Sequence, residues 1–412
     1  MRYSNVKTRL NILFIFAFLS LTLFALAKPS SAYSSDTLIN TSFEEQGTSV
    51  GKAYDWQDFM GGYTRTNNSK TGSWGITLRN SSDTGFSGAY QRLDLNQTSI
   101  KPVFIGGYVK GEKISNTSSW YGASIYAEIH LTSGKVVYWN SLSNTGTFDW
   151  RWIGFNTGIL SEIDAPISHI FIVPILGNSK GTAHFDDLTA IEHTPTEGAV
   201  TFMFDDGEAT TYSVAYPILK SKNWPGVIGV VTNFVGNSGF MRRVQLTELQ
   251  NNGWEIVSHS ISHNDLTTMT NSRAQKEIAL SKERLTSWGF RVNSFAFPYG
   301  AYNANLLAFG SSIYASMRPY EIGDNPKGSW PYQIRVRSIT NTTTPQQVKK
   351  WAEESKTKGT WNIFTFHSLD TIEDDEYRTD PNTFAQMVNE VYNVNIPVVT
   401  YQEGLNRFAQ KR

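Results

Sequence analysis

The chain has 412 residues, which is too long for one ordinary domain and predicts two. Its 36 basic residues balance its 36 acidic ones, so charge gives no reason to expect nucleic acid or an anionic membrane as a partner. With 40% hydrophobic residues the chain can bury sizeable cores, and with no cysteine it must hold them without disulfides.

Residues 1–32 have the pattern of a secretory signal peptide. A basic start precedes an apolar run over residues 10–27, and Ser30 and Ala32 follow at the spacing of a cleavage site. The alternative is an uncleaved anchor, because a run of 18 residues is just long enough to span a bilayer. In both cases we expect the rest of the chain to be secreted or at the cell surface. Once the peptide is cleaved, we expect no stable membrane insertion.

Residues 36–194 have the pattern of short strands separated by polar turns. Apolar clusters or alternation predict strands at 105–110, 124–131 and 135–140, with Gly, Asn and Ser between them. Because no helical period of useful length occurs, this segment predicts an all-β sandwich or jelly roll.

A linker at residues 195–200 precedes a change of pattern, and strands and helices then alternate. The predicted strands are at 199–204, 226–232, 254–258, 294–297, 333–338 and 361–366, and the predicted helices are at 212–222, 247–251, 272–288, 345–355 and 383–392. This alternation over residues 199–409 predicts a parallel α/β architecture, either a barrel or a doubly wound sheet.

Two carboxylates follow the first of these strands. The strand ending at Phe204 continues into Asp205, Asp206 and Gly207, and residues just past the C-terminal ends of parallel strands line the active site of a barrel. Successive side chains diverge, so one carboxylate can face a metal while the other faces substrate. Taken alone, an Asp-Gly pair more often marks an ordinary turn.

Two histidines follow the strand at 254–258. His259 and His263 are spaced i and i+4, which on a helical turn puts both imidazoles on one side, where they can bind one ion. One carboxylate with two imidazoles leaves coordination positions open for water and substrate, as in a catalytic metal site. Zinc is the expected ion, although other divalent ions, iron included, also fit this ligand set.

Two further strand ends carry weaker signals. Pro298, Tyr299 and Gly300 follow the strand at 294–297, where a proline turn can aim a backbone N–H inward to stabilise an oxyanion. His367 follows the strand at 361–366. A lone histidine there is more often structural, but beside a metal site it is a candidate general acid.

In this order, the four strand ends resemble the motifs of the polysaccharide deacetylase family, the chitooligosaccharide deacetylase (NodB) homology domain. The resemblance covers about residues 199–409. The matching segments are Phe204-Asp205-Asp206-Gly207, His259-Ser260-Ile261-Ser262-His263, Phe297-Pro298-Tyr299-Gly300 in part, and Phe364-Thr365-Phe366-His367.

This resemblance implies a distorted (β/α)7 TIM-like barrel and a role for each matched residue. The implied metal ligands are Asp206, His259 and His263. Asp205 is implied as the base, the Tyr299 N–H as an oxyanion donor and His367 as the general acid.

The sequence departs from the family pattern at three points. Ala296 stands where many members carry Arg, Thr365 stands where Leu is usual, and no clear Asp-x-x-Asp-Trp motif is present. The third motif instead resembles the branch that acts on exopolysaccharides such as poly-N-acetylglucosamine, in which an Arg on a later strand can steady the catalytic Asp. Arg335 and Arg337 alternate onto one face of their strand, and Arg337 is the favoured partner of Asp205. The alternative is that both arginines face solvent.

The first half carries a resemblance of its own. Asn40-Thr41-Ser42-Phe43-Glu44 opens it and Gly181-Thr182-Ala183-His184-Phe185-Asp186-Asp187-Leu188 closes it. Their order resembles that of jelly-roll carbohydrate-binding modules of the galactose-binding-like class, in which the opening Glu and the closing Asp often hold a structural calcium ion. Glu44 and Asp186 are therefore the implied calcium ligands, and oxygen ligands suit that ion. The alternative is a β-domain that merely orients the second half.

Together these observations predict a secreted, metal-dependent deacetylase. Its substrate would be an N-acetylated polysaccharide that contains N-acetylglucosamine: an exopolysaccharide, chitin or peptidoglycan. One alternative is an O-acetyl esterase on a xylan-like glycan, because the same metal-activated water serves both bonds. Another is a non-catalytic carbohydrate-binding protein. Ala296 and Thr365 differ from the family pattern, and such differences can weaken the residues that support the implied metal ligands. The sequence predicts no oligomeric state.

Overall fold

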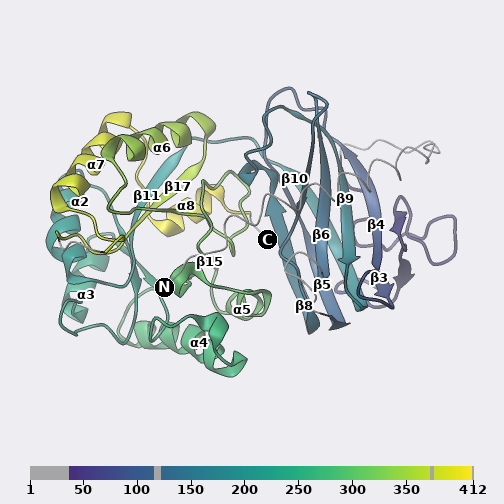
Figure 1. Ribbon diagram of the computed structural model, residues 1–412, viewed down its shortest axis with the longest axis horizontal. Coiled ribbons are helices and arrows are strands. Elements are labelled where there is room, and N and C mark those ends of the chain that lie inside the picture. Colours follow the sequence, from purple (N-terminus) through teal and green to yellow (C-terminus); the bar gives the residue numbers. More distant parts are fainter. Residues whose placement is uncertain (1–36, 116–121, 372–374, 411–412) are drawn as a thin grey trace. The chain divides into compact units, whose positions relative to one another are not determined.

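The structure, a computed structural model, describes residues 37–115, 122–371 and 375–410. From Asp36 on, the chain forms one compact unit, in which a β half with strands β1–β10 precedes an α/β half that begins at β11 (Figure 1). The predicted signal peptide, residues 1–32, lies outside the described residues. None of the helices in the described ranges has both the length and the apolar character needed to cross a membrane.

The β half consists of two antiparallel sheets of five strands each. The first has the order β1 (Gln57–Met60), β4 (Phe86–Asp94), β9 (Ile167–Gly177), β6 (Gly122–Leu131) and β7 (Val136–Asn140). The second has the order β2 (Thr64–Thr66), β3 (Gly75–Asn80), β10 (Gly181–Glu192), β5 (Val103–Ile114) and β8 (Gly146–Asn156). Alternate residues of both sheets, such as Ile129 and Ile170 from one and Val109 and Phe185 from the other, share one buried core. The all-β character agrees with the sequence, and the finer jelly-roll assignment stays a prediction.

The α/β half is built on a curled parallel sheet of seven strands, which confirms the predicted architecture. The strands are β11 (Ala199–Phe204), β12 (Val227–Val230), β13 (Glu255–Ser258), β14 (Ser294–Ala296), β15 (Ser316–Arg318), β16 (Arg337–Ser338) and β17 (Trp361–Phe366). Their order is β15-β14-β13-β12-β11-β17-β16. Within the described part of the chain β15 and β16 do not pair, so the sheet forms a half-barrel rather than a closed barrel.

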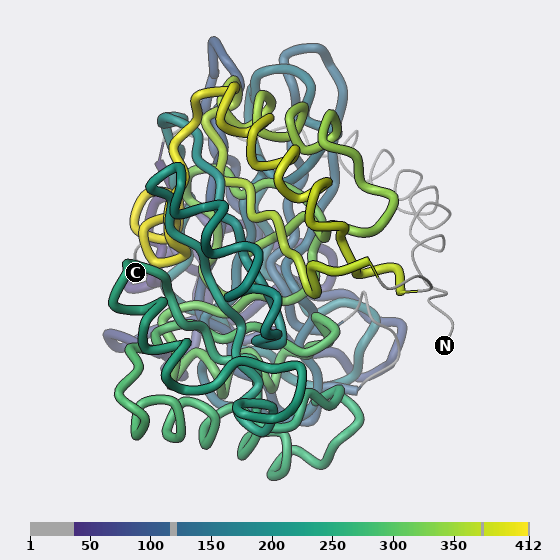
Figure 2. The backbone as a smooth tube through the Cα atoms, turned by 90° about the vertical axis from the view of Figure 1, so that its left-hand side faces the viewer, coloured from purple at the N-terminus to yellow at the C-terminus, as the bar shows by residue number. Residues whose placement is uncertain are grey.

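Helices connect these strands and cover the sheet. They are α2 (Tyr216–Lys220), preceded by a π turn at Thr211–Ala215, then α3 (Arg243–Asn251), α4 (Asn271–Ser287), α5 (Ala304–Gly310), α6 (Pro345–Lys358), α7 (Pro381–Val394) and α8 (Tyr401–Phe408). In Figure 2, where the left-hand side of Figure 1 faces the viewer, the coils of α2 and α3 in teal and of α7 in yellow lie toward the viewer. The sequence did not predict α5, α8 or the three-residue strand β15.

Strand β11, which lies between β12 and β17, is buried on both faces, as expected for a parallel strand between two layers. Phe202 and Phe204 pack into the large core that includes residues of the helices, whereas Ala199 and Met203 pack on the other face with Tyr401 of α8. Because the strands are parallel, the loops that follow β11, β13, β14 and β17 leave the same edge of the sheet, and these loops carry the candidate site.

Candidate metal centre and active site

Asp206, His259 and His263 converge after β11 and β13. The Asp206 Oδ1 lies 3.1 Å from the Nε2 of His263 and 3.5 Å from the Nε2 of His259, and one ligand atom from each residue lies within 4.8 Å of the others. The structure therefore brings together the three residues that the sequence predicted as metal ligands.

The three side chains fit a divalent cation. Asp206 Oδ1 is buried and has no hydrogen-bond partner, although it faces two imidazole nitrogens. His259 Nδ1 lies 2.8 Å from the Ala296 carbonyl, which accepts its proton and leaves the Nε2 lone pair free for a metal. Burial raises the pKa of Asp206 to about 6 and lowers the pKa of His259 to about 3. Burial also lowers the pKa of His263. Neutral imidazoles are the form that a metal ion requires.

The histidine loop is not the helical turn that the i, i+4 spacing suggested. Residues 259–265 form no helix, and Ser260 and His263 have positive φ angles of 70° and 57°. Such left-handed residues are costly outside glycine and are found where surrounding contacts fix them. The two imidazoles therefore meet through a tight loop rather than through a helical turn, and the binding of one ion by both stays a prediction.

Glu277 of α4 fixes this loop. Its Oε2 accepts hydrogen bonds from the Ile261 and Ser262 N–H groups, each at 2.9 Å, and its Oε1 accepts the Ser262 hydroxyl at 2.9 Å. Glu277 is not among the site residues that the sequence motifs predict. The available signal was an acidic residue on the apolar face of an amphipathic helix, next to Ile278 and one turn from Ala274.

Asp205 is a buried carboxylate that forms an ion pair with Arg318. Arg318 Nη2 donates to Asp205 Oδ2 at 2.5 Å, and both side chains are almost fully buried. Asp205 Oδ1 is buried without a hydrogen-bond partner. Burial raises the pKa of Asp205, but the charges of Arg318, His259 and His367 outweigh it and set the pKa below its ordinary value. The group is therefore ionised at neutral pH, with one oxygen held and the other free.

The assignment of Arg337 as the partner of Asp205 is corrected by the structure. Arg337 donates from Nε and Nη2 to Asp324 Oδ1, at 3.1 and 2.8 Å, and lies 4.0 Å from Glu354. Arg318 takes the expected role because it ends β15, the edge strand next to β14. The sequence signal for a strand of three residues is weak, so the sequence does not predict Arg318 as a site residue.

Tyr299 lies in the turn Pro298–Gly300 that follows β14. Its φ is 55° and that of Gly300 is 62°, so two successive residues are left-handed. A Cβ on Gly300 would lie 1.9 Å from the Tyr320 Cβ, so only glycine fits at this position. The Tyr299 ring lies 4.8 Å from the His263 ring, centroid to centroid, and its side chain is 56% exposed. The turn therefore places Tyr299 beside the group formed by Asp206, His259 and His263.

His367 directly follows β17 and is half-buried. Its charge acts on the pKa values of both Asp205 and Asp206, and its ring lies 5.1 Å from that of Tyr377. Its Nδ1 is buried and has no hydrogen-bond partner in the described ranges. All four predicted strand ends thus meet at one site.

Glu44 and Asp186 of the β half both bind one loop. Glu44 Oε1 accepts the N–H groups of Ser73 and Trp74 at 2.9 Å, and Asp186 Oδ2 accepts those of Lys70 and Thr71 at 2.6 and 3.0 Å. Burial raises the pKa of Asp186 to about 6. Both carboxylates thus fix the loop at residues 70–74 by accepting its backbone N–H groups. Calcium binding by Glu44 and Asp186 stays a prediction.

The comparison with known families supports a polysaccharide deacetylase domain in this chain. Residues 192–313 match the family model described as polysaccharide deacetylase. That stretch contains Asp205, Asp206, the histidine pair and Tyr299, and it ends before Arg318 and His367.

Curated relatives are similar over a limited part of their length. YxkH of Bacillus subtilis (strain 168), named as a polysaccharide deacetylase, is 31% identical over 114 residues, 27% of this chain and 41% of that protein. A poly-beta-1,6-N-acetyl-D-glucosamine N-deacetylase of Staphylococcus aureus (strain MRSA252) is 29% identical over 119 residues, 25% of this chain and 41% of that protein. The chain thus spans 41% of the length of each of these relatives.

Solved structures include similar chains. The Xyl-CE4 domain of a multidomain xylanase from the hindgut metagenome of Trinervitermes trinervoides has 19% identity and a TM-score of 0.38, over 51% of this chain and 91% of that chain.

Proposed function

We propose that the α/β half is a metal-dependent N-deacetylase of a polysaccharide that contains N-acetylglucosamine. The observation that carries the proposal is a buried, partnerless Asp206 oxygen that faces two imidazoles, next to an ionised Asp205 with one free oxygen. The name of the similar Staphylococcus aureus protein, a poly-N-acetylglucosamine deacetylase, supports the substrate class.

A divalent metal, with zinc as the expected ion, would be held by Asp206, His259 and His263. When bound, such an ion polarises the acetyl carbonyl and acidifies a water molecule. The Ala296 carbonyl and Glu277 then serve to orient the imidazoles, because they hold the His259 ring and the histidine loop in place.

Asp205 is the proposed general base. Arg318 fixes its Oδ2, so that Oδ1 is free to take a proton from the attacking water. Because its pKa lies below the ordinary value, Asp205 is ready to accept a proton at neutral pH.

Tyr299 and His367 complete the proposed reaction. No hydrogen bond of the described residues uses the Tyr299 N–H, which is therefore available to the oxyanion that forms when water adds to the acetyl carbon. His367 donates a proton to the amine nitrogen as the carbon–nitrogen bond breaks. The products are acetate and a free amine on the sugar.

The test is acetate release from four substrates: poly-N-acetylglucosamine, chitin oligomers, peptidoglycan and acetylxylan. We expect release from at least one of the N-acetylated glycans. Release from acetylxylan alone would replace the proposal by an O-acetyl esterase. Glycan binding without any release would replace it by a carbohydrate-binding protein.

Secretion through residues 1–32 and sugar binding by the β half are further parts of the proposal. The sequence pattern supports the first, and the resemblance of the β half to carbohydrate-binding modules supports the second. A mature protein that still carries residues 1–32 would contradict cleavage. If the protein keeps its full affinity for the glycan after the β half is removed, sugar binding by the β half is contradicted.

A further inference from the structure

Arg151 of β8 is a half-buried arginine without an anionic partner among the described residues. Its Nη1 donates to Asn144 Oδ1 at 3.3 Å and to Asn305 Oδ1 at 3.2 Å, and its Nη2 donates to Asn305 Oδ1 at 3.3 Å. Its Nε is buried without a hydrogen-bond partner, and no ion pair of the described residues includes it. Burial lowers the pKa of Arg151 to about 10. An arginine has five donor hydrogens, so these long bonds to neutral amides leave much of its capacity unused.

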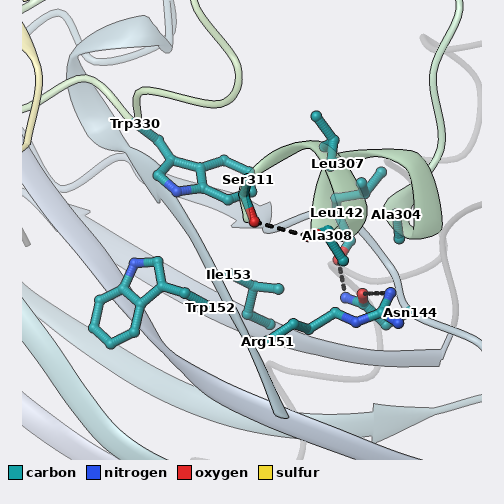
Figure 3. A pocket seen from close by; sticks show the side chains of 10 residues that line it. All are labelled: Leu142, Asn144, Arg151, Trp152, Ile153, Ala304, Leu307, Ala308, Ser311 and Trp330. Carbon is teal, nitrogen blue, oxygen red and sulfur yellow. Dashed lines mark hydrogen bonds between the residues drawn. The ribbon is translucent and has the colours of Figure 1, made fainter. Parts of the chain in front are cut away.

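The surrounding residues hold the guanidinium in place. It lies over the Phe148 ring, 4.0 Å from the centroid. The fully buried Asn144 is itself fixed, because its Nδ2 donates to the Leu142 and Ala123 carbonyls at 2.8 and 3.2 Å. Figure 3 shows the Arg151 side chain extending toward Asn144, near Ala304 and Ala308 of α5. A fixed cation loses little conformational freedom when a ligand binds.

Two of the cavities that the described residues line include Arg151 in their walls, and they differ in size. The cavity drawn in Figure 3 has about 20 Å³, which is no more than space for a water molecule. The other has about 340 Å³ and is open to solvent. That volume lies within the range of about 300–1,000 Å³ that is usual for small-molecule sites.

The wall of the larger cavity combines neutral hydrogen-bonding groups with an apolar surface. Thr147, Asn271, Gln275 and Asn305 supply hydroxyl and amide groups, and Leu306 and Phe309 supply the apolar part. None of the described residues that line it carries a carboxylate, and Arg151 is the one charged residue among them.

We propose that this cavity is a binding site for an acidic sugar unit, separate from the metal centre. The carboxylate of a uronic acid would pair with Arg151, its hydroxyl groups would bond to the amides, and its apolar face would lie on Phe309. A compact inorganic anion would satisfy Arg151 but would leave the amides and the apolar surface unused. The proposal does not depend on the proposed deacetylase activity.

The experiment measures binding of three probes to the full chain by calorimetry: glucuronate, glucose and inorganic phosphate. Glucuronate has no acetyl group, so the result is independent of any deacetylation. We expect glucuronate to bind roughly tenfold or more tightly than glucose, because a charge-assisted pair is lost with the neutral sugar. Equal binding of the two sugars, or no binding of glucuronate, would overturn the proposal. Tighter binding of phosphate than of glucuronate would overturn the sugar assignment.

Two variants and one control connect the binding to Arg151. Arg151→Gln removes the charge, and Gln275→Glu places a carboxylate in the wall that competes for Arg151 while keeping the shape of the side chain. We expect each to weaken glucuronate binding by roughly tenfold or more. Lys276→Gln changes an exposed charge next to Gln275 that is not part of the wall, and its affinity should stay within about twofold of wild type. Wild-type affinity in a folded Gln275→Glu protein would contradict the site even if Arg151→Gln fails to fold.

Discussion

Two pairs of acidic residues, one in each half of the molecule, differ in how their oxygens are satisfied. In the β half, Glu44 and Asp186 each accept two backbone N–H groups of the loop at residues 70–74. In the α/β half, Asp205 and Asp206 each keep a buried oxygen without a hydrogen-bond partner.

This difference separates a structural role from a chemical one. A buried polar atom without a partner costs free energy, so a protein keeps several such atoms together only where a ligand or a reaction uses them. Arg318 Nε and His367 Nδ1 add two more at the same edge of the sheet. The comparison therefore predicts large effects on activity from changes at Asp205 and its neighbours, and effects on stability alone from changes at Asp186.

The largest effect is expected for Asp205→Asn. An amide cannot take the proton from water, so the turnover number should fall by about 10²–10⁴-fold. The variant should still bind one zinc ion, since Asp206, His259 and His263 are unchanged. Steady-state kinetics of acetate release together with the zinc content check both parts, and wild-type turnover would exclude Asp205 as the base.

The second-largest effect on activity is expected for Arg318→Met. Without the arginine, burial dominates and raises the pKa of Asp205, so the acid limb of the kcat/KM profile should move to higher pH. Removing one member of a buried pair should also destabilise the fold by about 3–5 kcal/mol. The matched control is Arg337→Met, which removes the contact with Asp324 and should leave the acid limb in place. A shift in the control but not in Arg318→Met would restore the original assignment.

Glu277→Gln should act on the metal rather than on the proton transfer. The change weakens the charge-assisted bonds to the Ile261 and Ser262 N–H groups and loosens the histidine loop. Zinc affinity should fall by about 10–100-fold, while activity returns at saturating zinc. A zinc titration followed by acetate release measures both, and an unchanged affinity would show that the loop holds its shape without Glu277.

The smallest effect on catalysis is expected for Asp186→Asn. Its Oδ2 accepts the Lys70 and Thr71 N–H groups, so the variant should lose about 1–3 kcal/mol of unfolding free energy. Turnover on short soluble chitin oligomers should stay within twofold of wild type, because the residue belongs to the β half. Chemical denaturation measures the free energy of unfolding, and steady-state kinetics measure the turnover number. A large loss of turnover with an unchanged free energy of unfolding would contradict the prediction.

The sequence was sufficient for the parts of the site that immediately follow the two six-residue strands made mostly of apolar residues, β11 and β17. β11 and β17 are buried at every position, so their ends at Phe204 and Phe366 could be located from apolar runs alone. Parallel strands all point the same way, so the residues after β11 and β17 and the histidines after β13 could be expected at the same edge of the sheet.

The parts that the sequence did not reveal depend on tertiary contacts. β15 has three residues and gains its strand conformation from pairing with β14, so neither it nor Arg318 had a local signal. The histidine loop depends on positive φ angles at Ser260 and His263, which residue spacing does not encode. Glu277 accepts hydrogen bonds from residues 15 and 16 positions earlier in the chain, and such contacts become visible only in the folded structure.

The most direct test of the account is to remove metal from the wild-type protein with a chelator and then restore zinc while following acetate release from poly-N-acetylglucosamine. We predict that release stops on removal and returns with one zinc per chain, and that His263→Gln, which lacks one imidazole, recovers little of it. Full acetate release by the metal-free protein would contradict a catalytic role for Asp206, His259 and His263 as metal ligands.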